Sequence, residues 1–455
     1  RRRKKKEREK KEKGDGGGHR RKKTLTGWDY MVNEVKASWL GALNSTTDIT
    51  SQINFNYGKT IVVDKDFLLT ANTQIKKIVY AGGKIYTNSN ITITIDEIED
   101  TKETLWVLNS GNSIKLIQDW VRPDWWGDIT ETLNFSENAL PDLGGTIYLS
   151  NKRYKDNFHR AGLVGQYKCF TKDNVRIIGA GMPSSDHNYT KLIDGTGSII
   201  DGMLLFSASG SYNEGFGVDS GIDYLNARNS GVVVPAEIGE GILSGPPNLV
   251  DYTKVPTNIT FGNIVGLCAR PNDPVHSFML GENVEQVKTF GTVKGIYGQH
   301  GIVIKCASVK CERVESYCNG QDGIIFKSGT DLRNKVSGVN IETAYTNANG
   351  ELGKTPHMLP TSTDSMGVFF NNNSTMSDII IGKLESYGYY HPIRFDSNAM
   401  SSISINIAIG ICSFTGKGKT LAGSVGLNFI KGKYKNVLIN TLEVINVKTA
   451  LASAL

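Results

Sequence analysis

Gly301-Ile-Val-Ile is the first of five related phrases between His300 and Val447. The other four are Gly323-Ile-Ile-Phe, Gly367-Val-Phe-Phe, Pro392-Ile-Arg-Phe and Gly426-Leu-Asn-Phe. A second phrase follows each of them, and its five versions are Val314-Glu-Ser-Tyr, Ile341-Glu-Thr-Ala-Tyr, Leu384-Glu-Ser-Tyr, Ile411-Cys-Ser-Phe and Leu442-Glu-Val-Ile. Successive first phrases lie 22, 44, 25 and 34 residues apart. A period near 22 with insertions is typical of a solenoid.

The phrases also indicate which secondary structure the solenoid contains. Each is short, rich in β-branched or aromatic residues and followed by Gly, Asn or Ser, which predicts a strand and a turn. No helical periodicity of ten residues is found after Gly144. We therefore expect an all-β fold, a parallel β-helix with one coil per repeat, in which each coil is hydrogen-bonded to the next.

Composition excludes several classes of protein. The chain has 455 residues, with 50 Gly and 12 Pro. No apolar run is long enough for a membrane span, and no signal peptide is recognisable. The spacing of the six Cys fits neither a zinc finger nor a disulfide-rich scaffold, and we expect Cys306 and Cys311 to be buried. Neither a P-loop nor a metal-spaced His/Cys set is present, so we expect no cofactor and no metal.

Charge is concentrated at one end of the chain. Residues 1–23 carry 14 Lys/Arg and 4 Asp/Glu, so this segment has a net charge of +10 and the remainder −4. A charge run of this kind cannot bury apolar surface, so we expect a disordered basic tail. The alternative is an arm that docks on an acidic partner or on nucleic acid. Because the body is mildly acidic, we do not expect nucleic acid as a partner.

Five further segments follow the tail. Residues 24–45 place Trp28, Met31 and Val35 at helical spacings, which predicts a helix used either for assembly or for packing on the next domain. Residues 46–120 have the strand pattern of a small β-rich domain, and 121–150 form a neck and a cap for the first coil. Residues 151–447 are expected to be the parallel β-helix, with a long loop near 234–256, and 448–455 a C-terminal tail.

Three motifs in the first part of the chain resemble a known family. They are Gly82-Gly-Lys-Ile-Tyr with the alternating strand that ends at Ile95, then Pro123-Asp-Trp-Trp-Gly127, and then Gly144-Gly-Thr-Ile-Tyr-Leu149. In this order they resemble the roll, the neck and the first coil of phage tailspikes and capsule depolymerases of the pectate-lyase-like class. The acidic Gly motif usual between neck and coil is absent, and a capping helix is expected within Glu131 to Leu140.

The resemblance implies a function and a set of partners. The family has a right-handed parallel β-helix, is homotrimeric and sits in the virion tail. It binds and depolymerises a bacterial surface polysaccharide, either a capsule or a lipopolysaccharide O-antigen. The N-terminal segment would then attach to a tail or baseplate protein, the protein would act outside the cell, and no membrane would be involved. The rival function is that of a non-enzymatic tail component or receptor-binding adhesin.

Alignment of the second phrases predicts a column of acidic residues. The residue after the apolar anchor is Glu315, Glu342, Glu385, Cys412 and Glu443 in successive coils, and Lys294 belongs to the same column one coil earlier. Stacked coils lie about 4.8 Å apart. The column either faces solvent as a by-product of repetition or lines a groove. In a groove, paired carboxylates are what glycoside hydrolysis requires, so Glu315, Glu342 and Glu385 are the candidate catalytic residues.

Other residues are candidates for substrate binding or for a different chemistry. Tyr317, Tyr345 and Tyr387 form a neighbouring aromatic ladder that could stack on sugars. Lys294, His391 and Arg394 are further candidates for substrate binding. A polysaccharide lyase would need such a base near a neutralised uronate, and this alternative remains open beside hydrolysis. All six Trp lie at or before Trp126, so the coils offer only Tyr and Phe for stacking.

Overall fold

The computed structural model describes residues 21–23, 28–30, 33–127, 132–154, 168–201, 203–206, 208–219, 231–234, 256–267, 276–281, 284–328, 335–354, 364–397, 403–415, 425–430, 433–445 and 449–453. Most of the expected basic tail and most of the long loop near 234–256 lie outside these residues. The chain divides into two compact units, Arg1–Tyr148 and Leu149–Leu455.

The first unit contains two small parallel sheets. One has the strand order β10-β8-β6-β4-β3 and the other β5-β7-β9. The bounds are β3 Glu34–Lys36, β4 Thr60–Val63, β5 Phe67–Leu69, β6 Thr73–Tyr80, β7 Ile85–Thr87, β8 Thr92–Ile98, β9 Trp106–Val107 and β10 Ser113–Leu116. From β4 onward each strand pairs with the strand two places along the chain. This β-rich unit therefore winds as a short coil of its own, and β8 shows the alternating burial that its sequence predicts.

The helix predicted over residues 24–45 is wrong for the part that the structure describes. Trp28–Tyr30 is strand β2, which pairs antiparallel with β1, Arg21–Lys23. Glu34–Lys36 is strand β3, and only Ala37–Leu40 is helical, as the 3-10 helix η1. The physical reason is that Val35 is fully buried and β3 pairs with β4. This pairing outweighs the local helical spacing of the apolar residues. A short helix, α2, follows at Thr50–Phe55.

The neck packs aromatic rings. Strand β11, Trp120–Val121, leads into the 3-10 helix η2, Pro123–Trp126, in which both tryptophans are buried. Trp125 lies edge-on to Trp120, with ring centroids 5.3 Å apart. The capping helix forms as α3, Thr132–Ala139, and β12, Gly145–Tyr148, ends the unit. The neck tryptophans are therefore core residues and not a surface for sugars.

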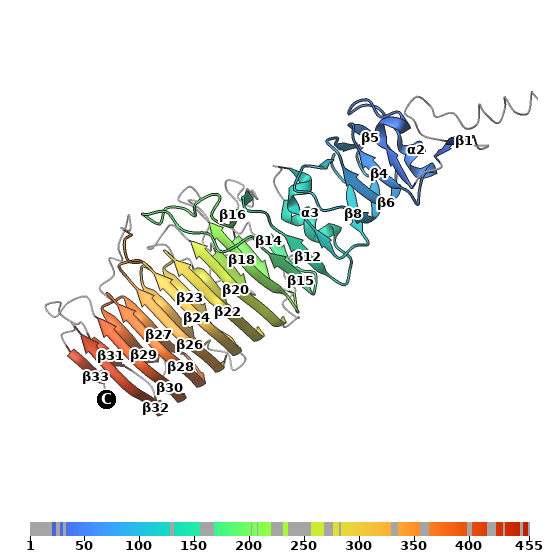
Figure 1. Ribbon diagram of the computed structural model, residues 1–455. Helices are drawn as coiled ribbons and strands as arrows, with labels where there is room; N and C mark the ends of the chain where they lie inside the picture. The colour runs from blue at the N-terminus through green and yellow to red at the C-terminus, as the bar shows by residue number, and fades with distance from the viewer. Residues whose placement is uncertain are drawn as a thin grey trace, which may run out of the picture. The chain divides into compact units, whose positions relative to one another are not determined.

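The second unit is a parallel β-helix, which confirms the predicted fold class. Figure 1 shows its strands stacked coil on coil. One sheet, the D sheet, runs β15-β18-β20-β22-β24-β26-β28-β30-β32, and off this path β16 pairs with β18 and β13 with β16. The other, the E sheet, runs β14-β17-β19-β21-β23-β25-β27-β29-β31-β33. Each strand pairs in parallel with its counterpart one coil later, so every coil contributes one strand to each sheet.

The bounds of the strands in the D sheet are β13 Arg153–Tyr154, β15 Val175–Ile178, β16 Ser198–Asp201, β18 Tyr212–Asp219, β20 Thr257–Leu267, β22 Glu285–Ile296, β24 Ala307–Tyr317, β26 Val336–Asn347, β28 Thr375–Tyr387, β30 Ile403–Thr415 and β32 Lys433–Ile445. Those in the E sheet are β14 Lys168–Phe170, β17 Met203–Phe206, β19 Gly231–Val234, β21 His276–Leu280, β23 His300–Ile304, β25 Asp322–Lys327, β27 Met366–Asn372, β29 His391–Ser397, β31 Val425–Phe429 and β33 Thr449–Ser453. The repeated pairing of short strands gives each coil the same inward-facing positions.

The first phrases align in the structure as they do in the sequence. Ile302, Ile324, Val368, Ile393 and Leu427 stand in register on neighbouring strands of the E sheet. The segment 448–455, expected as a tail, instead contains β33, in which Leu451 pairs with Leu427. Cys306 and Cys311 are free and buried, as predicted. Burial raises the pKa of Cys311 to about 11, which makes this thiol an inert core residue.

Candidate functional site

The strand register corrects the predicted glutamate column. Glu315 pairs with Tyr345, Tyr345 with Glu385, and the column continues through Ser413 to Glu443. Ala344 is the true counterpart of Val314, so the second phrase at Ile341 was aligned three residues too early. Cys412 likewise belongs to the buried column beside Leu384. Lys294 does pair with Glu315, as expected.

Glu342 is consequently displaced from the other two candidate catalytic residues. Its neighbour Ile341 pairs with Cys311 on β24, so Glu342 lies closer to the start of its strand than Tyr345 does. Glu342 is exposed, whereas Glu315 is buried. The pair that the structure brings onto one column is Glu315 and Glu385, two coils apart with Tyr345 between them. At about 4.8 Å per coil their backbones are about 9–10 Å apart.

Tyr317, Tyr345 and Tyr387 do form a ladder, although they are not in register. Tyr317 pairs with Asn347 and not with Tyr345. The rings nonetheless lie against one another, with centroids 5.5 Å apart both from Tyr317 to Tyr345 and from Tyr345 to Tyr387. Burial raises the pKa of Tyr317 and of Tyr345, so both hydroxyls remain neutral donors. We call Tyr317, Tyr345 and Tyr387 the tyrosine row.

Glu315 is held by three partners at one end of this row. Its Oε1 lies 2.5 Å from Arg313 Nε, and its Oε2 lies 3.5 Å from Lys294 Nζ. The Tyr317 hydroxyl donates to Oε2 over 3.1 Å. Lys294 Nζ also lies 5.2 Å from the centre of the Tyr317 ring, a cation–π distance. Glu385, by contrast, is paired with Lys383 at 2.8 Å, and its side chain is 23% exposed.

Sequence reasoning missed Glu351 and Lys354, which complete this end of the site. Glu351 pairs with Lys294, and its Oε2 lies 2.9 Å from Lys354 Nζ. Burial alone would raise the pKa of Glu351, but the two lysines hold it below its ordinary value. The only sequence signal for this turn was its place in the interval of 44 residues between first phrases, which marks an insertion.

Residues 182–197 form a second missed feature, which we call the strap. An antiparallel bridge joins Ser185 to Leu192, and the tip between them turns at Tyr189, whose φ of 56° is left-handed. The Tyr189 ring contacts Tyr297 at 5.9 Å and belongs to one buried apolar cluster with Leu192, Leu267, Ile296 and Tyr317. The strap therefore lies over β20, β22 and β24.

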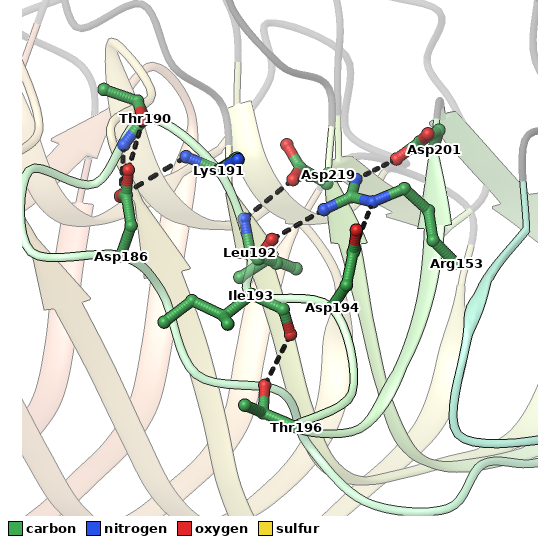
Figure 2. Close-up of polar contacts among 10 residues, drawn as sticks. All are labelled: Arg153, Asp186, Thr190, Lys191, Leu192, Ile193, Asp194, Thr196, Asp201 and Asp219. Carbon is green, nitrogen blue, oxygen red and sulfur yellow. Dashed lines mark hydrogen bonds and ion pairs between the residues drawn. The ribbon is translucent and has the colours of Figure 1, made fainter.

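Arg153 anchors the base of the strap, as Figure 2 shows. Its Nε lies 2.6 Å from Asp194 of the strap, and its Nη2 donates to the Leu192 carbonyl over 2.6 Å. Nη1 binds Asp201 and lies 3.1 Å from Asp219. Asp219 also accepts the backbone N–H of Leu192 over 2.7 Å. Three of these contacts fix Leu192 and Asp194 of the strap to β13 and β18, and Asp201 on β16 holds Arg153 in place.

The tip of the strap is fixed by the turn that carries Glu351. The Tyr189 hydroxyl accepts the backbone N–H of Glu351 over 2.5 Å. Lys354 Nζ donates to the Ser185 carbonyl over 3.0 Å and lies 4.9 Å from the centre of the Tyr189 ring. Segments more than 160 residues apart in sequence therefore meet beside Lys294, Glu315 and Tyr317.

His391 and Arg394 do not join this site. Both are on β29 in the E sheet, whereas the tyrosine row belongs to the D sheet. Arg394 Nη1 lies 2.5 Å from Asp364 and Nη2 lies 2.8 Å from Asp396, so two of its nitrogens already bind protein carboxylates. His391 Nε2 lies 3.5 Å from the same Asp364. These residues form a separate polar group, which weakens their expected role in binding a uronate beside the glutamates.

The arrangement on the D sheet has the elements of a carbohydrate site. Tyrosine combines an apolar ring with a polar tip, which suits the face and the hydroxyls of a sugar. Glu315 and Glu385 flank Tyr345, and inverting glycosidases have carboxyl groups about 6.5–9.5 Å apart, with space for a water molecule. Retaining enzymes have them at about 5–5.5 Å, which is shorter than the backbone separation of about 9–10 Å between Glu315 and Glu385.

Two possibilities find no support in the described part of the chain. No group of three or more His, Cys, Asp or Glu side chains there is arranged to hold a metal ion. None of the helices described is long and apolar enough to cross a membrane.

Known proteins show only low similarity to this chain. No family model matches the chain, and no curated protein matches it. Among solved structures, a double mutant of the periplasmic alginate epimerase AlgG is 9% identical, with a TM-score of 0.31 over 90% of this chain and 83% of that one. The enzymatically active domain of bacteriophage CBA120 tailspike protein 2 is 16% identical, with a TM-score of 0.22 over 94% and 56%.

Proposed function

We propose that this protein is a tailspike-like virion component that binds a bacterial surface polysaccharide on the tyrosine row and hydrolyses its glycosidic bonds. The observation that carries the proposal is the column in which Glu315 and Glu385 flank Tyr345 beside the tyrosine row. The neck and first-coil motifs of the sequence support the same conclusion. Capsular polysaccharide and lipopolysaccharide O-antigen are the substrates that this resemblance implies.

The proposed chemistry uses the two carboxyl groups in the manner of an inverting hydrolase. One carboxyl group protonates the glycosidic oxygen as the bond to the sugar breaks, and the other removes a proton from the attacking water. The two-coil separation of Glu315 and Glu385 is the wider spacing of an inverting mechanism, and the sugar and the water would lie over Tyr345 between them. The tyrosine row would position the sugar rings, because an oriented substrate reacts faster than a free one.

The first test is incubation of the protein with a panel of capsular polysaccharides and O-antigens, followed by sizing of the products. We expect shorter chains without the ultraviolet absorbance of unsaturated uronate ends. Chains that shorten and gain this absorbance would show a lyase and contradict the proposed hydrolysis. A polymer that remains intact but is retained by the protein would favour the adhesin.

Substitution then tests the residues. Glu315→Gln and Glu385→Gln should each lower the rate of cleavage by about 10²–10⁴-fold, the usual contribution of a general acid or base. Glu443→Gln is the matched control, because Glu443 is on the same column at an exposed position. Glu342→Gln should also leave the rate unchanged. Full activity of both Glu315→Gln and Glu385→Gln would contradict the assignment.

A non-enzymatic adhesin is the second candidate, and the ion pairs favour it. Glu315 is bound by Arg313, Lys294 and Tyr317, and Glu351 by two lysines, so these charged groups already stabilise one another. A rigid surface of this kind can recognise a glycan without reacting with it. Under either function we propose a homotrimer attached to a tail or baseplate protein through the N-terminal segment, active outside the cell.

A further inference from the structure

The outward-facing side of the D sheet is covered over one stretch and open over the next. In the first stretch, on β20, β22 and β24, the outward residues Val265, Leu267, Ile296 and Tyr317 are between 0% and 6% exposed. In the second, from β26 to β32, the side chain of Glu385 is 23% exposed and Ile445 is 49% exposed. The change falls at Tyr345, which is half-buried and packs against the edge of the covered cluster that contains Tyr189 and Tyr317.

The strap packs tightly against the D sheet. A Cβ on Gly217, which pairs with Val265, would approach Leu192 Cδ1 and Pro183 Cγ of the strap to 2.5 Å. The base is bound by Arg153 and Asp219, and the tip by the Glu351 turn. Apolar packing, ion pairs and hydrogen bonds to the backbone all hold the strap in this position, so it forms a wall at one end of the tyrosine row.

The two lysines beside the strap already form ion pairs and hydrogen bonds within the protein. Lys294 pairs with Glu315 and Glu351, and Lys354 with Glu351 and Ser185. Both lysines thus hold the Glu351 turn in place, Lys354 against the strap and Lys294 against the D sheet, and neither adds a sugar-binding position beyond the tyrosine row. A polymer that lies along Tyr345 and Tyr387 therefore meets Tyr189 and the Glu351 turn at Tyr317 and cannot continue over the preceding coils.

We propose that the strap makes this site specific for the end of a polysaccharide chain, with the terminal sugar at Tyr345 against the strap and the covered Tyr317, and the following sugars toward Tyr387. This inference rests on the proposed function, because it concerns the same site and the same class of ligand. It adds that the protein recognises a chain end and not an internal segment. Cleavage at Glu315 and Glu385 then releases a short product of constant size from that end.

The test compares short and long fractions of the panel polysaccharide that the protein retains. If the chain end is bound, the number of protein molecules bound per polysaccharide chain at saturation stays the same for both fractions. At low conversion the sized products should be one short species, while the polymer peak hardly moves. Binding that rises in proportion to chain length, or a broad ladder of products, would overturn the inference and leave the proposed function intact. Failure to retain any polysaccharide in the panel would overturn the proposed function first.

A variant without the wall gives a second test. Replacing residues 186–191 by Asn-Gly joins Ser185 to Leu192, which already pair as neighbours in a hairpin. This variant should bind several molecules per long chain, whereas Lys191→Ala, at an exposed tip residue, should behave as the wild type. If the folded variant still binds once per chain, the wall is not the cause and the inference is wrong. If the variant does not fold, the wild-type measurement decides.

Discussion

Asp201 and Asp219 lie on neighbouring strands and bind the same arginine. They stand in register on β16 and β18, and both bind Nη1 of Arg153. Asp219 is 1% exposed and Asp201 is 8% exposed. Burial raises the pKa of Asp201 to about 6, because Arg153 offsets only part of the cost of burying the charged carboxylate and the nearby Asp219 adds repulsion. One half-buried guanidinium thus binds two buried carboxyl groups and the exposed Asp194.

This raised pKa predicts a pH-dependent stability. The folded state binds the Asp201 proton more tightly than the unfolded state, whose pKa is near 3.8. The contribution of this group to the free energy of unfolding therefore falls as pH rises from 3.8 to about 6, by at most about 3 kcal/mol at 1.36 kcal/mol per pKa unit. Asp201→Asn should remove this part of the slope in denaturant titrations over that pH range.

Asp194→Asn is the matched control, because Asp194 binds the same arginine but its side chain is 70% exposed. An exposed ion pair contributes about 0–1 kcal/mol, so this variant should keep the pH slope of the wild type. An unchanged slope in Asp201→Asn, or a slope lost equally in both variants, would contradict the assignment to Asp201.

The strap is an element whose contacts can be tested directly. Gly217→Ala should force Leu192 or the strand to shift, because the added Cβ would lie 2.5 Å from Leu192 Cδ1. Overpacking of this kind costs about 1–3 kcal/mol in the free energy of unfolding. Leu192→Ala removes one of the two strap side chains that lie 2.5 Å from the added Cβ, the other being Pro183. The double variant should therefore be more stable than the sum of the two single effects predicts.

Denaturant titrations of the four proteins in this cycle measure the coupling. Strict additivity would mean that Leu192 does not lie over Gly217. That result would also remove the packing argument for a fixed strap.

The elements also show what the sequence could predict. The first phrases were aligned correctly because each coil repeats one inward apolar position, from Ile302 to Leu427. The second phrases were misaligned at β26 because Ile341 and Ala344 are both buried, and the glutamate of the other phrases recurs after Ile341, whereas Tyr345 follows Ala344. Spacing alone could not decide which of the two matched Val314. The strap and the Glu351 turn escaped prediction because they belong to no repeat and meet across 162 residues.

At the scale of the solenoid, stacking makes every coil depend on its neighbours. Phe326, Phe370, Phe395 and Phe429 form one continuous stack on the E sheet, with ring centroids 4.4–4.8 Å apart. In such a fold the stability is approximately the sum of coil terms and nearest-neighbour terms. The same residue type should therefore contribute a different amount to the free energy of unfolding in the middle of the stack than near its end.

Phe370→Ala and Phe429→Ala test this dependence. Phe370 is 1% exposed and lies between Phe326 and Phe395, so its removal should cost about 3–5 kcal/mol in the free energy of unfolding. Phe429 is half-buried and packs on Phe395 and Tyr434, so its removal should cost less. Hydrogen exchange should quicken only in β31 and β33 for Phe429→Ala, and across β25 to β29 for Phe370→Ala. Equal losses with faster exchange in every coil would mean that the solenoid unfolds as one cooperative unit, so that the position of a coil would not determine how much its core residues contribute.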